Sequence, residues 1–156
     1  MAIEIERKFL LSSDAWRAAV VRSVPMSQGY LAADPQCSVR VRRQGEEAFL
    51  NIKSATLGVE RLEFDYPIPV ADAETLLQQL CGGRTVIKTR HYVPAGHHTW
   101  EIDEFEGANR GLVVAEIELT YTDETFERPA WLGREVSDER RYYNVCLLEN
   151  PYSEWD

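Results

Sequence analysis

Charged and apolar residues alternate through most of this sequence, and the alternation limits the folds that the chain can adopt. In the first segment, Glu4, Glu6 and Lys8 stand two positions apart. Because side chains two positions apart share one face of a strand, such a segment predicts a strand with a charged face. Alternation of this kind predicts about eight strands, at residues 2–11, 27–33, 37–44, 47–54, 59–68, 84–94, 98–105 and 112–121.

Eight mostly antiparallel strands within 156 residues indicate a mainly β fold, either a sandwich or a closed barrel. A few flanking helices are expected at residues 13–22, 71–80 and in part of 137–148. The sequence contains no linker, internal repeat or low-complexity tract, so we expect residues 1–156 to form a single domain. Alternation alone does not choose between the sandwich and the barrel.

The charged face contains like-charged neighbours, such as Glu4 with Glu6 and Arg40 with Arg42. A solvated outer face over an apolar core is the ordinary explanation of this pattern. The alternative is a barrel with the charges inside, where a cation between the acids and an anion between the bases would offset the repulsion. Eight acids and seven bases share this face: Glu4, Glu6, Glu63, Asp65, Glu101, Asp103, Glu116 and Glu118, with Lys8, Arg40, Arg42, Lys53, Arg61, Lys88 and Arg90.

Net charge and cysteine content exclude several classes of protein. The 17 Lys and Arg against 26 Asp and Glu give a net charge of −9, so a diffuse basic surface for nucleic acid is absent. No stretch approaches the ~20 apolar residues that span a bilayer, and the N-terminus does not read as a signal peptide. The three cysteines lack the spacing of a disulfide framework or a zinc site. We expect a cytoplasmic protein with neither nucleic-acid nor membrane partners.

The two kinds of charge suit the two parts of a metal–phosphate complex. Carboxylate oxygens are hard ligands that favour Mg²⁺ or Mn²⁺. Arginine and lysine bind phosphate, arginine through two hydrogen bonds at once. Phosphoryl transfer requires this combination, in which charge is neutralised and the substrate is held in place. The sequence contains neither a P-loop nor a serine or cysteine nucleophile signature.

Short motifs follow one another in order along nearly the whole chain. Glu4-Ile5-Glu6-Arg7-Lys8 fits the pattern E-x-E-x-K, which is the hallmark of the CYTH superfamily, also called triphosphate tunnel metalloenzymes. The sequence resembles the short bacterial members of this superfamily. The resemblance implies a closed eight-stranded antiparallel barrel with the charges inside, and metal-dependent hydrolysis of a triphosphate, most closely inorganic tripolyphosphate. The further matching segments are residues 28–31, 39–43, 52–54, 61–65, 88–90, 100–103, 116–118, 131–137 and 141–144.

The resemblance also implies roles for individual residues. Lys88 with Tyr30 resembles a lysine–tyrosine pair proposed to activate water. The alternatives are a phosphate contact for Lys88 and a packing role for Tyr30. Arg134 and Arg141 are candidates for closing one tunnel mouth. The implied metal ligands are Glu4, Glu6, Glu116 and Glu118, with Glu63 and Asp103 as further ligands or partners of ligands, and the implied phosphate-binding residues are Lys8, Arg40, Arg42, Lys53 and Arg90.

Other activities remain open at this stage. The superfamily also includes class IV adenylate cyclases and thiamine triphosphatases, and a polyphosphate- or nucleotide-binding module without catalysis is the alternative outside enzymes. A cyclase must bind the adenine of ATP, and we find no segment to assign to that role. We therefore rank the inorganic triphosphatase first. Because the apolar outer face of such a barrel must be covered, we also expect a homodimer.

Overall fold

The computed structural model of the chain describes residues 3–34, 36–55 and 58–155. These residues form nine strands, one α-helix and five short 3₁₀ turns. The helix, α1, spans Val70–Gln79, and the 3₁₀ turns are η1 (Ala15–Ala19), η2 (Gly107–Asn109), η3 (Arg140–Tyr142), η4 (Cys146–Leu148) and η5 (Tyr152–Glu154). The strands are β1 (Ile3–Leu11), β2 (Arg22–Ala33), β3 (Cys37–Gln44), β4 (Glu47–Ser54), β5 (Glu60–Pro67), β6 (Thr85–Ala95), β7 (His98–Phe105), β8 (Val113–Leu119) and β9 (Leu132–Glu135).

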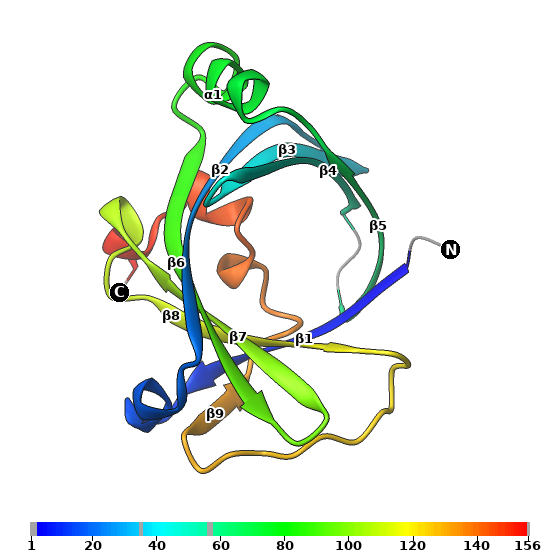
Figure 1. The fold of residues 1–156 in the computed structure, drawn as a ribbon, viewed down its shortest axis with the longest axis vertical. Helices are drawn as coiled ribbons and strands as arrows, with labels where there is room; N and C mark the ends of the chain where they lie inside the picture. The colour runs from blue at the N-terminus through cyan, green and yellow to red at the C-terminus, as the bar shows by residue number, and fades with distance from the viewer. Residues whose placement is uncertain (1–2, 35, 56–57, 156) are drawn as a thin grey trace.

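The strands form a closed antiparallel barrel. Their order is β5-β4-β3-β2-β6-β7-β8-β1, and the sheet closes because β1 also pairs with β5. Figure 1 looks along this barrel. Strand β9 is added to the edge of β1, where Leu132 lies opposite Leu11. The predicted closed barrel of eight antiparallel strands is therefore confirmed, and β9 is a strand that the alternation did not reveal.

The register places the charged face of each strand inside the barrel. Glu4 on β1 lies opposite Arg61 on β5, across the closure. On the other side of β1, Glu6 lies opposite Glu118. These side chains line an internal cavity, so the explanation of the charged face as a solvated outer surface is wrong.

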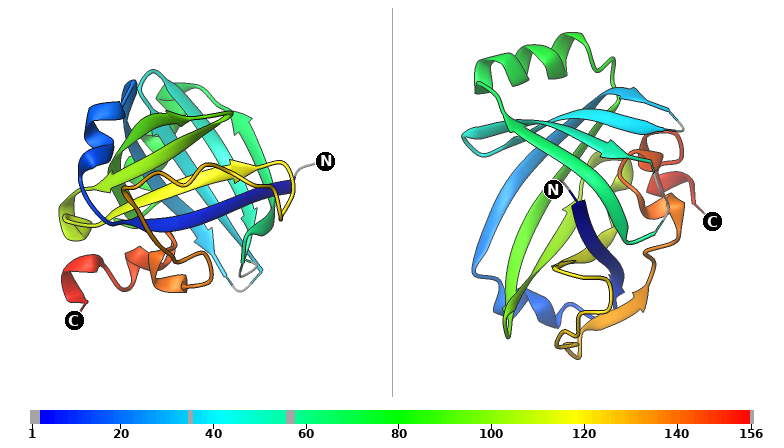
Figure 2. Two further views of the ribbon diagram at one scale, coloured as in Figure 1. Left: turned by 90° about the horizontal axis from the view of Figure 1, so that it is seen from below. Right: turned by 90° about the vertical axis from the view of Figure 1, so that its right-hand side faces the viewer.

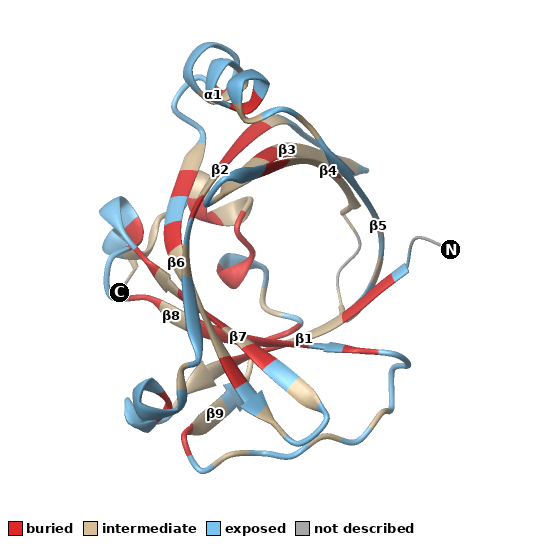
Figure 3. Cartoon of the chain, viewed as in Figure 1, coloured by how far each residue is buried: buried red, intermediate tan, exposed pale blue. Residues whose placement is uncertain are grey.

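Apolar side chains on the outside of the barrel pack under the connecting segments. Phe9, Trp100 and Phe126 meet edge to face beneath residues 120–131. Buried residues are concentrated on this side, in β1, β7 and β8 (Figure 3). On the opposite side, α1 lies over β2, β3 and β4 (Figure 1). A Cβ atom at Gly29 would lie 2.5 Å from Cys81 Sγ, so the segment after α1 packs directly against the β2 backbone.

The helix expected at residues 13–22 is largely wrong, because only Ala15–Ala19 form a single 3₁₀ turn. Trp16 is buried and anchors this turn. From Val20 onward the backbone is extended, and the Val21 N–H donates to the carbonyl of Tyr92. Pairing with β6 thus extends β2 towards the N-terminus and ends the helix. The helix expected at 71–80 is confirmed as α1, and the partly helical tail is present as short 3₁₀ turns.

The C-terminal segment, residues 136–155, lies against one end of the barrel in both side views (Figure 2). Tyr142 and Leu147 pack there against Val86, Phe105 and Val114, which are interior positions at that end of the strands. The segment therefore closes this end. Within the described chain the three cysteines are free, and no helix is long and apolar enough to cross a membrane.

Candidate active site

A cavity of about 270 Å³ occupies the barrel interior. All seven of the bases predicted for the charged face line it, together with seven of the eight acids. The eighth acid, Asp103, is fully buried in the wall. Seven of the eight barrel strands contribute these charged side chains, and β2 contributes Tyr30, because each strand presents every second residue to the interior. The sequence-based grouping of the charged residues is therefore confirmed.

One wall of the cavity, formed by β1, β6, β7 and β8, contains a continuous ion-pair network around Asp103. Arg90 donates two hydrogen bonds to the Asp103 carboxylate, at 2.8 and 2.9 Å, and Lys88 Nζ donates to Oδ2 at 2.6 Å. Glu101 accepts from Arg90 at 3.0 Å, and Glu116 lies 3.3 Å from Lys8 Nζ. Both oxygens of Asp103 are thus engaged by cations, which favours its role as a partner of Lys88 and Arg90 over that of a ligand.

The opposite wall, formed by β1, β3, β4 and β5, centres on Lys53. Its ammonium lies 3.0 Å from Glu4 Oε1 and 3.3 Å from Glu63 Oε2. The contact with Glu4 does not have hydrogen-bond geometry, and this oxygen is buried without a hydrogen-bond partner among the described residues. Arg42 donates to Asp65 at 3.0 Å, farther along the same wall. Lys53 therefore gathers two of the implied metal ligands, and the Glu4 oxygen beside it has an ion-pair contact but no hydrogen bond.

Glu6 on β1 and Glu118 on β8 lie opposite each other, and among the described residues neither has an ion pair shorter than 3.8 Å. Burial, with Glu116 and Glu4 nearby, raises the pKa of Glu6 well above its usual value. Burial and the proximity of Glu4 likewise raise the pKa of Glu118. Arg61 is the cation recorded beside Glu6, at 3.8 Å. A carboxylate with a raised pKa is stabilised by a cation brought close to it, so this part of the cavity suits a divalent ion.

Lys88 and Glu116 have pKa values shifted in the direction that a reactive site requires. Burial, only partly offset by Asp103, lowers the pKa of Lys88 to about 8, and Arg90 adds to the effect. Burial would raise the pKa of Glu116, but Lys8 and Arg90 outweigh it and hold that pKa well below its usual value. Glu116 is therefore a permanently charged carboxylate, whereas the ammonium of Lys88 loses its proton more readily than an ordinary lysine.

Tyr30 and Lys88 line the same cavity but have different partners. Tyr30 on β2 lies opposite Arg40 on β3, whereas Lys88 lies opposite Met26. Four residues of strand separate these two levels, a distance of about 13 Å along the sheet. Two guanidinium nitrogens in the described cavity, Arg40 Nε and Arg61 Nε, are buried without a hydrogen-bond partner. Such donors suit the oxygens of a bound phosphate.

The C-terminal segment adds residues to the cavity that the charge pattern did not single out. Tyr143 and Asn144 line the cavity beside Lys88. Gln28 donates to Asn144 at 3.0 Å. Gln28 and Asn144 both lie in segments that match family motifs, and this match could have pointed to them. The charge pattern did not, because neither side chain is charged. Arg134 and Arg141 do not line the cavity, and their role at a tunnel mouth stays a prediction beside the alternative of a surface role for Arg134. Both are exposed, Arg134 in an ion pair with Glu139 and Arg141 against the Trp155 ring.

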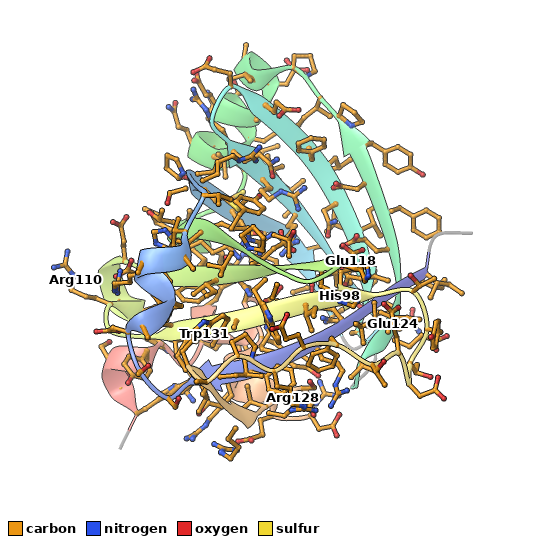
Figure 4. The ribbon with its side chains drawn as sticks, turned by 60° about the horizontal axis from the view of Figure 1, so that its bottom comes forward. His98, Arg110, Glu118, Glu124, Arg128 and Trp131 are labelled. Carbon is orange, nitrogen blue, oxygen red and sulfur yellow. The ribbon has the colours of Figure 1, made fainter. Side chains whose placement is uncertain are left out.

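A second pocket adjoins the cavity at the end away from Asn144. Tyr92, Glu101 and Glu118 line both, so they form the boundary between them. His98 Nε2 and Glu124 Oε2 lie 2.5 Å apart at the outer rim. Figure 4 shows Glu118, His98 and Glu124 at this end of the strands. The acidic side chains therefore extend from the cavity to the open mouth.

The donor set of the cavity fits a hard divalent cation. The lack of a hydrogen bond to the buried Glu4 Oε1 and the raised pKa values of Glu6 and Glu118 are the observations that support the fit. Within the described ranges, no three His, Cys, Asp or Glu side chains converge as a preformed metal centre. The carboxylates instead contact the interior bases, such as Lys53 and Arg61. A cation would thus be held together with the substrate phosphates rather than by protein alone, as is usual for Mg²⁺.

Comparison with known proteins places the chain among close relatives. The sequence matches the CYTH domain over residues 2–145. It is 43% identical to an inorganic triphosphatase of Acetivibrio thermocellus over 152 residues, covering 97% of both chains. It is 36% identical to an inorganic triphosphatase of Nitrosomonas europaea, covering 92% of this chain and 95% of the relative. The solved structure of the inorganic triphosphatase NE1496 superposes with a TM-score of 0.68 at 34% identity, covering 95% of each chain.

Proposed function

This chain belongs to the CYTH domain family, and on that basis we propose that it hydrolyses inorganic triphosphate inside its barrel. The observation that carries the proposal is the barrel cavity lined by seven bases and seven acids from seven strands. Such a site neutralises a polyanion while it excludes most of the solvent, which strengthens each electrostatic contact. The two relatives named inorganic triphosphatase, which match nearly the full chain, support the same substrate.

The bases would hold the phosphates from both walls. Arg40 and Arg61 each offer a buried Nε donor that has no partner among the described residues. The Lys53 ammonium lies between Glu4 and Glu63, and the Lys8 ammonium lies beside Glu116, so each can exchange part of its ion pairing for a phosphate oxygen. Arg42, paired with Asp65, and Arg90, paired with Asp103, are the remaining phosphate-binding candidates, one on each wall of the cavity. We assign substrate binding to Lys8, Arg40, Arg42, Lys53 and Arg90, with Arg61 as an addition.

The proposed cofactor is Mg²⁺ or Mn²⁺, held by the carboxylates together with the substrate. Glu4, Glu6 and Glu118 are the candidates with raised pKa values, and Glu116 and Glu63 are the candidates that stay charged beside bases. When bound, such an ion would supply positive charge that offsets the negative charge developing on the phosphate oxygens during cleavage.

Lys88 is the proposed base, and Tyr30 its proposed partner in activating water. A lysine with a pKa of about 8 is partly unprotonated near neutral pH, which a base requires. Lys88 faces the cavity from a nearly fully buried position, so a water molecule beside it would be largely shielded from solvent. Tyr30 lies opposite Arg40 on the neighbouring strand, so its proposed part in activating water would be exerted beside the phosphate-binding residues and not through direct contact with Lys88.

Phosphate release from tripolyphosphate, ATP and thiamine triphosphate, each with Mg²⁺, Mn²⁺ or EDTA, tests the proposal. We expect rapid metal-dependent release from tripolyphosphate. Glu116→Gln should remove this activity, whereas Glu104→Gln, on the outer face of β7, should retain it. Cyclic AMP formed from ATP without phosphate release from tripolyphosphate would instead identify a cyclase. Preference for thiamine triphosphate would identify a thiamine triphosphatase, and binding of all three without any product would identify a binding module.

We also propose that two copies of the chain associate through the outer face of β5. Leu62, Phe64 and Tyr66 on this face are 40–52% exposed, and Ile3 on β1 lies beside Leu62. A contiguous apolar surface of this kind is a common site of association. Light scattering should give twice the mass of one chain, and Phe64→Glu should give the mass of one. A wild-type protein that is monomeric at tens of micromolar would contradict the dimer.

The single-domain organisation over residues 1–156 and a cytoplasmic location are part of the same proposal. The match to one domain over residues 2–145 supports the first. The three free cysteines, Cys37, Cys81 and Cys146, support a reducing compartment. Localisation of a tagged chain by cell fractionation tests the second, and recovery with the membrane or secreted fraction would refute it.

A further inference from the structure

Two lysines of the cavity are held by the C-terminal segment as well as by the barrel. Lys88 Nζ donates to Asp103 on β7 at 2.6 Å and to Asn144 Oδ1 at 3.1 Å. Lys8 Nζ lies 3.3 Å from Glu116 on β8 and donates to the carbonyl of Tyr142 at 3.2 Å. Each ammonium thus has one acceptor from a strand and one from the segment that closes the barrel.

The contact of Asn144 with Lys88 is directional. Asn144 Oδ1 also accepts a hydrogen bond from Gln28 Nε2 at 3.0 Å, so both lone pairs of this oxygen are used. An ammonium has three donors, and Lys88 uses two of them on Asp103 and Asn144. The tetrahedral geometry of the nitrogen then determines where its third position points. Because Lys88 lines the cavity, that third position is available to substrate or water.

Asn144 is itself held in place independently of Lys88. The hydroxyl of its neighbour Tyr143 donates to the carbonyl of Ser137 at 2.6 Å and accepts from the Gly58 N–H at 3.2 Å. On the other side of Asn144, Leu147 is buried in the apolar cluster at the barrel end. The acceptor therefore belongs to an anchored segment and can restrain the lysine.

We propose that Asn144 is a positioning residue that aims the Lys88 ammonium into the cavity, so that the C-terminal segment completes the active site. The inference rests on the proposed triphosphatase function, because the effect of Asn144 on turnover passes through Lys88. If Asp103 were its only partner, the Lys88 ammonium could rotate about that single hydrogen bond. Asn144 adds the second contact that selects one orientation.

A double-mutant cycle between Asn144 and Lys88 tests the proposal. Asn144→Ala should lower kcat for tripolyphosphate by roughly 10- to 100-fold, the scale on which misplacement of a catalytic group acts, with little change in KM. In a Lys88→Met background, Asn144→Ala should cause no further loss of the residual rate, because the group that it positions is already gone. An equal loss in both backgrounds would overturn the proposal.

Asn109→Ala is the matched control. Asn109 is equally buried and also holds the C-terminal segment, through its Oδ1 and the Tyr152 N–H at 2.9 Å, but it does not line the cavity. We expect this variant to lose stability in urea and to keep its kcat. If Asn109→Ala lowered kcat as much as Asn144→Ala, general loosening of the segment would explain both results and the proposal would be refuted.

The same cycle measured by urea unfolding without substrate separates this inference from the proposed function. A wild-type protein that does not hydrolyse tripolyphosphate would refute the function. Coupling between Asn144 and Lys88 in the free energy of unfolding would still support the positioning contact, and its absence would refute that contact. If Asn144→Ala does not fold, Asn144→Asp keeps an acceptor oxygen but adds a carboxylate that raises the pKa of Lys88, so its kcat is expected to approach the wild-type value only at alkaline pH, with a higher KM. A folded Asn144→Asp whose kcat stays low at alkaline pH would count against the proposal.

Discussion

Asp103 is the residue whose replacement most sharply tests the electrostatic organisation of the barrel. Its side chain is fully buried and compensates two cations at once, Lys88 at 2.6 Å and Arg90 at 2.8 and 2.9 Å. Asp103→Asn keeps the size of the side chain but removes the charge. Breaking a buried ion pair by removing one partner costs about 3–5 kcal/mol, and the lower end applies because Asn keeps an acceptor. For a chain of this length, that loss corresponds to a decrease in Tm of roughly 10 °C.

Urea and thermal unfolding of Asp103→Asn would measure this loss, with Glu101→Gln as the control. Glu101 makes one contact with Arg90 and is partly open to solvent, so its loss should cost less than about 1 kcal/mol. Tripolyphosphate should stabilise Asp103→Asn more than wild type, because the anion replaces the missing counter-charge on Lys88 and Arg90. Equal unfolding midpoints for wild type, Asp103→Asn and Glu101→Gln would refute the reasoning.

Four further predictions concern separate parts of the molecule. Glu116→Ala should lower metal-dependent phosphate release at least about 100-fold while the far-UV spectrum stays unchanged, and full activity would show that Glu116 is no ligand. Lys88→Ala should lower kcat more than it raises KM, and a pure rise in KM would make Lys88 a phosphate contact only. Gly29→Ala should cost about 1–3 kcal/mol in thermal unfolding, because its Cβ would meet Cys81 Sγ at 2.5 Å, and Cys81→Ala should restore part of the loss. The hydrogen bond from Arg7 lowers the pKa of Glu135 below its usual value of 4.5, so the contribution of Glu135 to stability is present above pH 4.5 and is lost as the pH falls through the pKa of the folded state. The difference in urea stability between wild type and Glu135→Gln should therefore shrink over that pH range.

Sequence reasoning was most successful for features that depend on periodicity. The period of two brought Glu4, Glu6 and Lys8 to one face, and the structure places all three in the cavity. It failed where tertiary contacts compete with local preference. Residues 13–22 have a polar cap and helical composition, yet pairing of the Val21 N–H with Tyr92 ends the helix after one turn.

The assignment of roles within the cavity depended on contacts between strands that are distant in sequence. The family resemblance implied that Asp103 is either a further metal ligand or a partner of the ligands. Only the barrel places it against Lys88 and Arg90, which engage both of its oxygens. Asn144 carries no charge, and its part in the site follows from a segment that folds back on the barrel from more than fifty residues away from Lys88.

The sequence by itself determined which side chains share a face, because strand geometry sends every second residue to the same side whatever the strand packs against. The sequence also determined which functional groups this face presents, since most of its side chains are carboxylates or bases. Alternation is compatible with either face inside, and the tertiary structure decided that the charged face turns inward: β1 pairs with both β8 and β5 to close the barrel, and the charged side chains line its cavity. Closure of the barrel then decided which charged side chains contact one another. The resulting burial raises the pKa of Glu6, which a nearby cation would stabilise in its charged form, and lowers the pKa of Lys88.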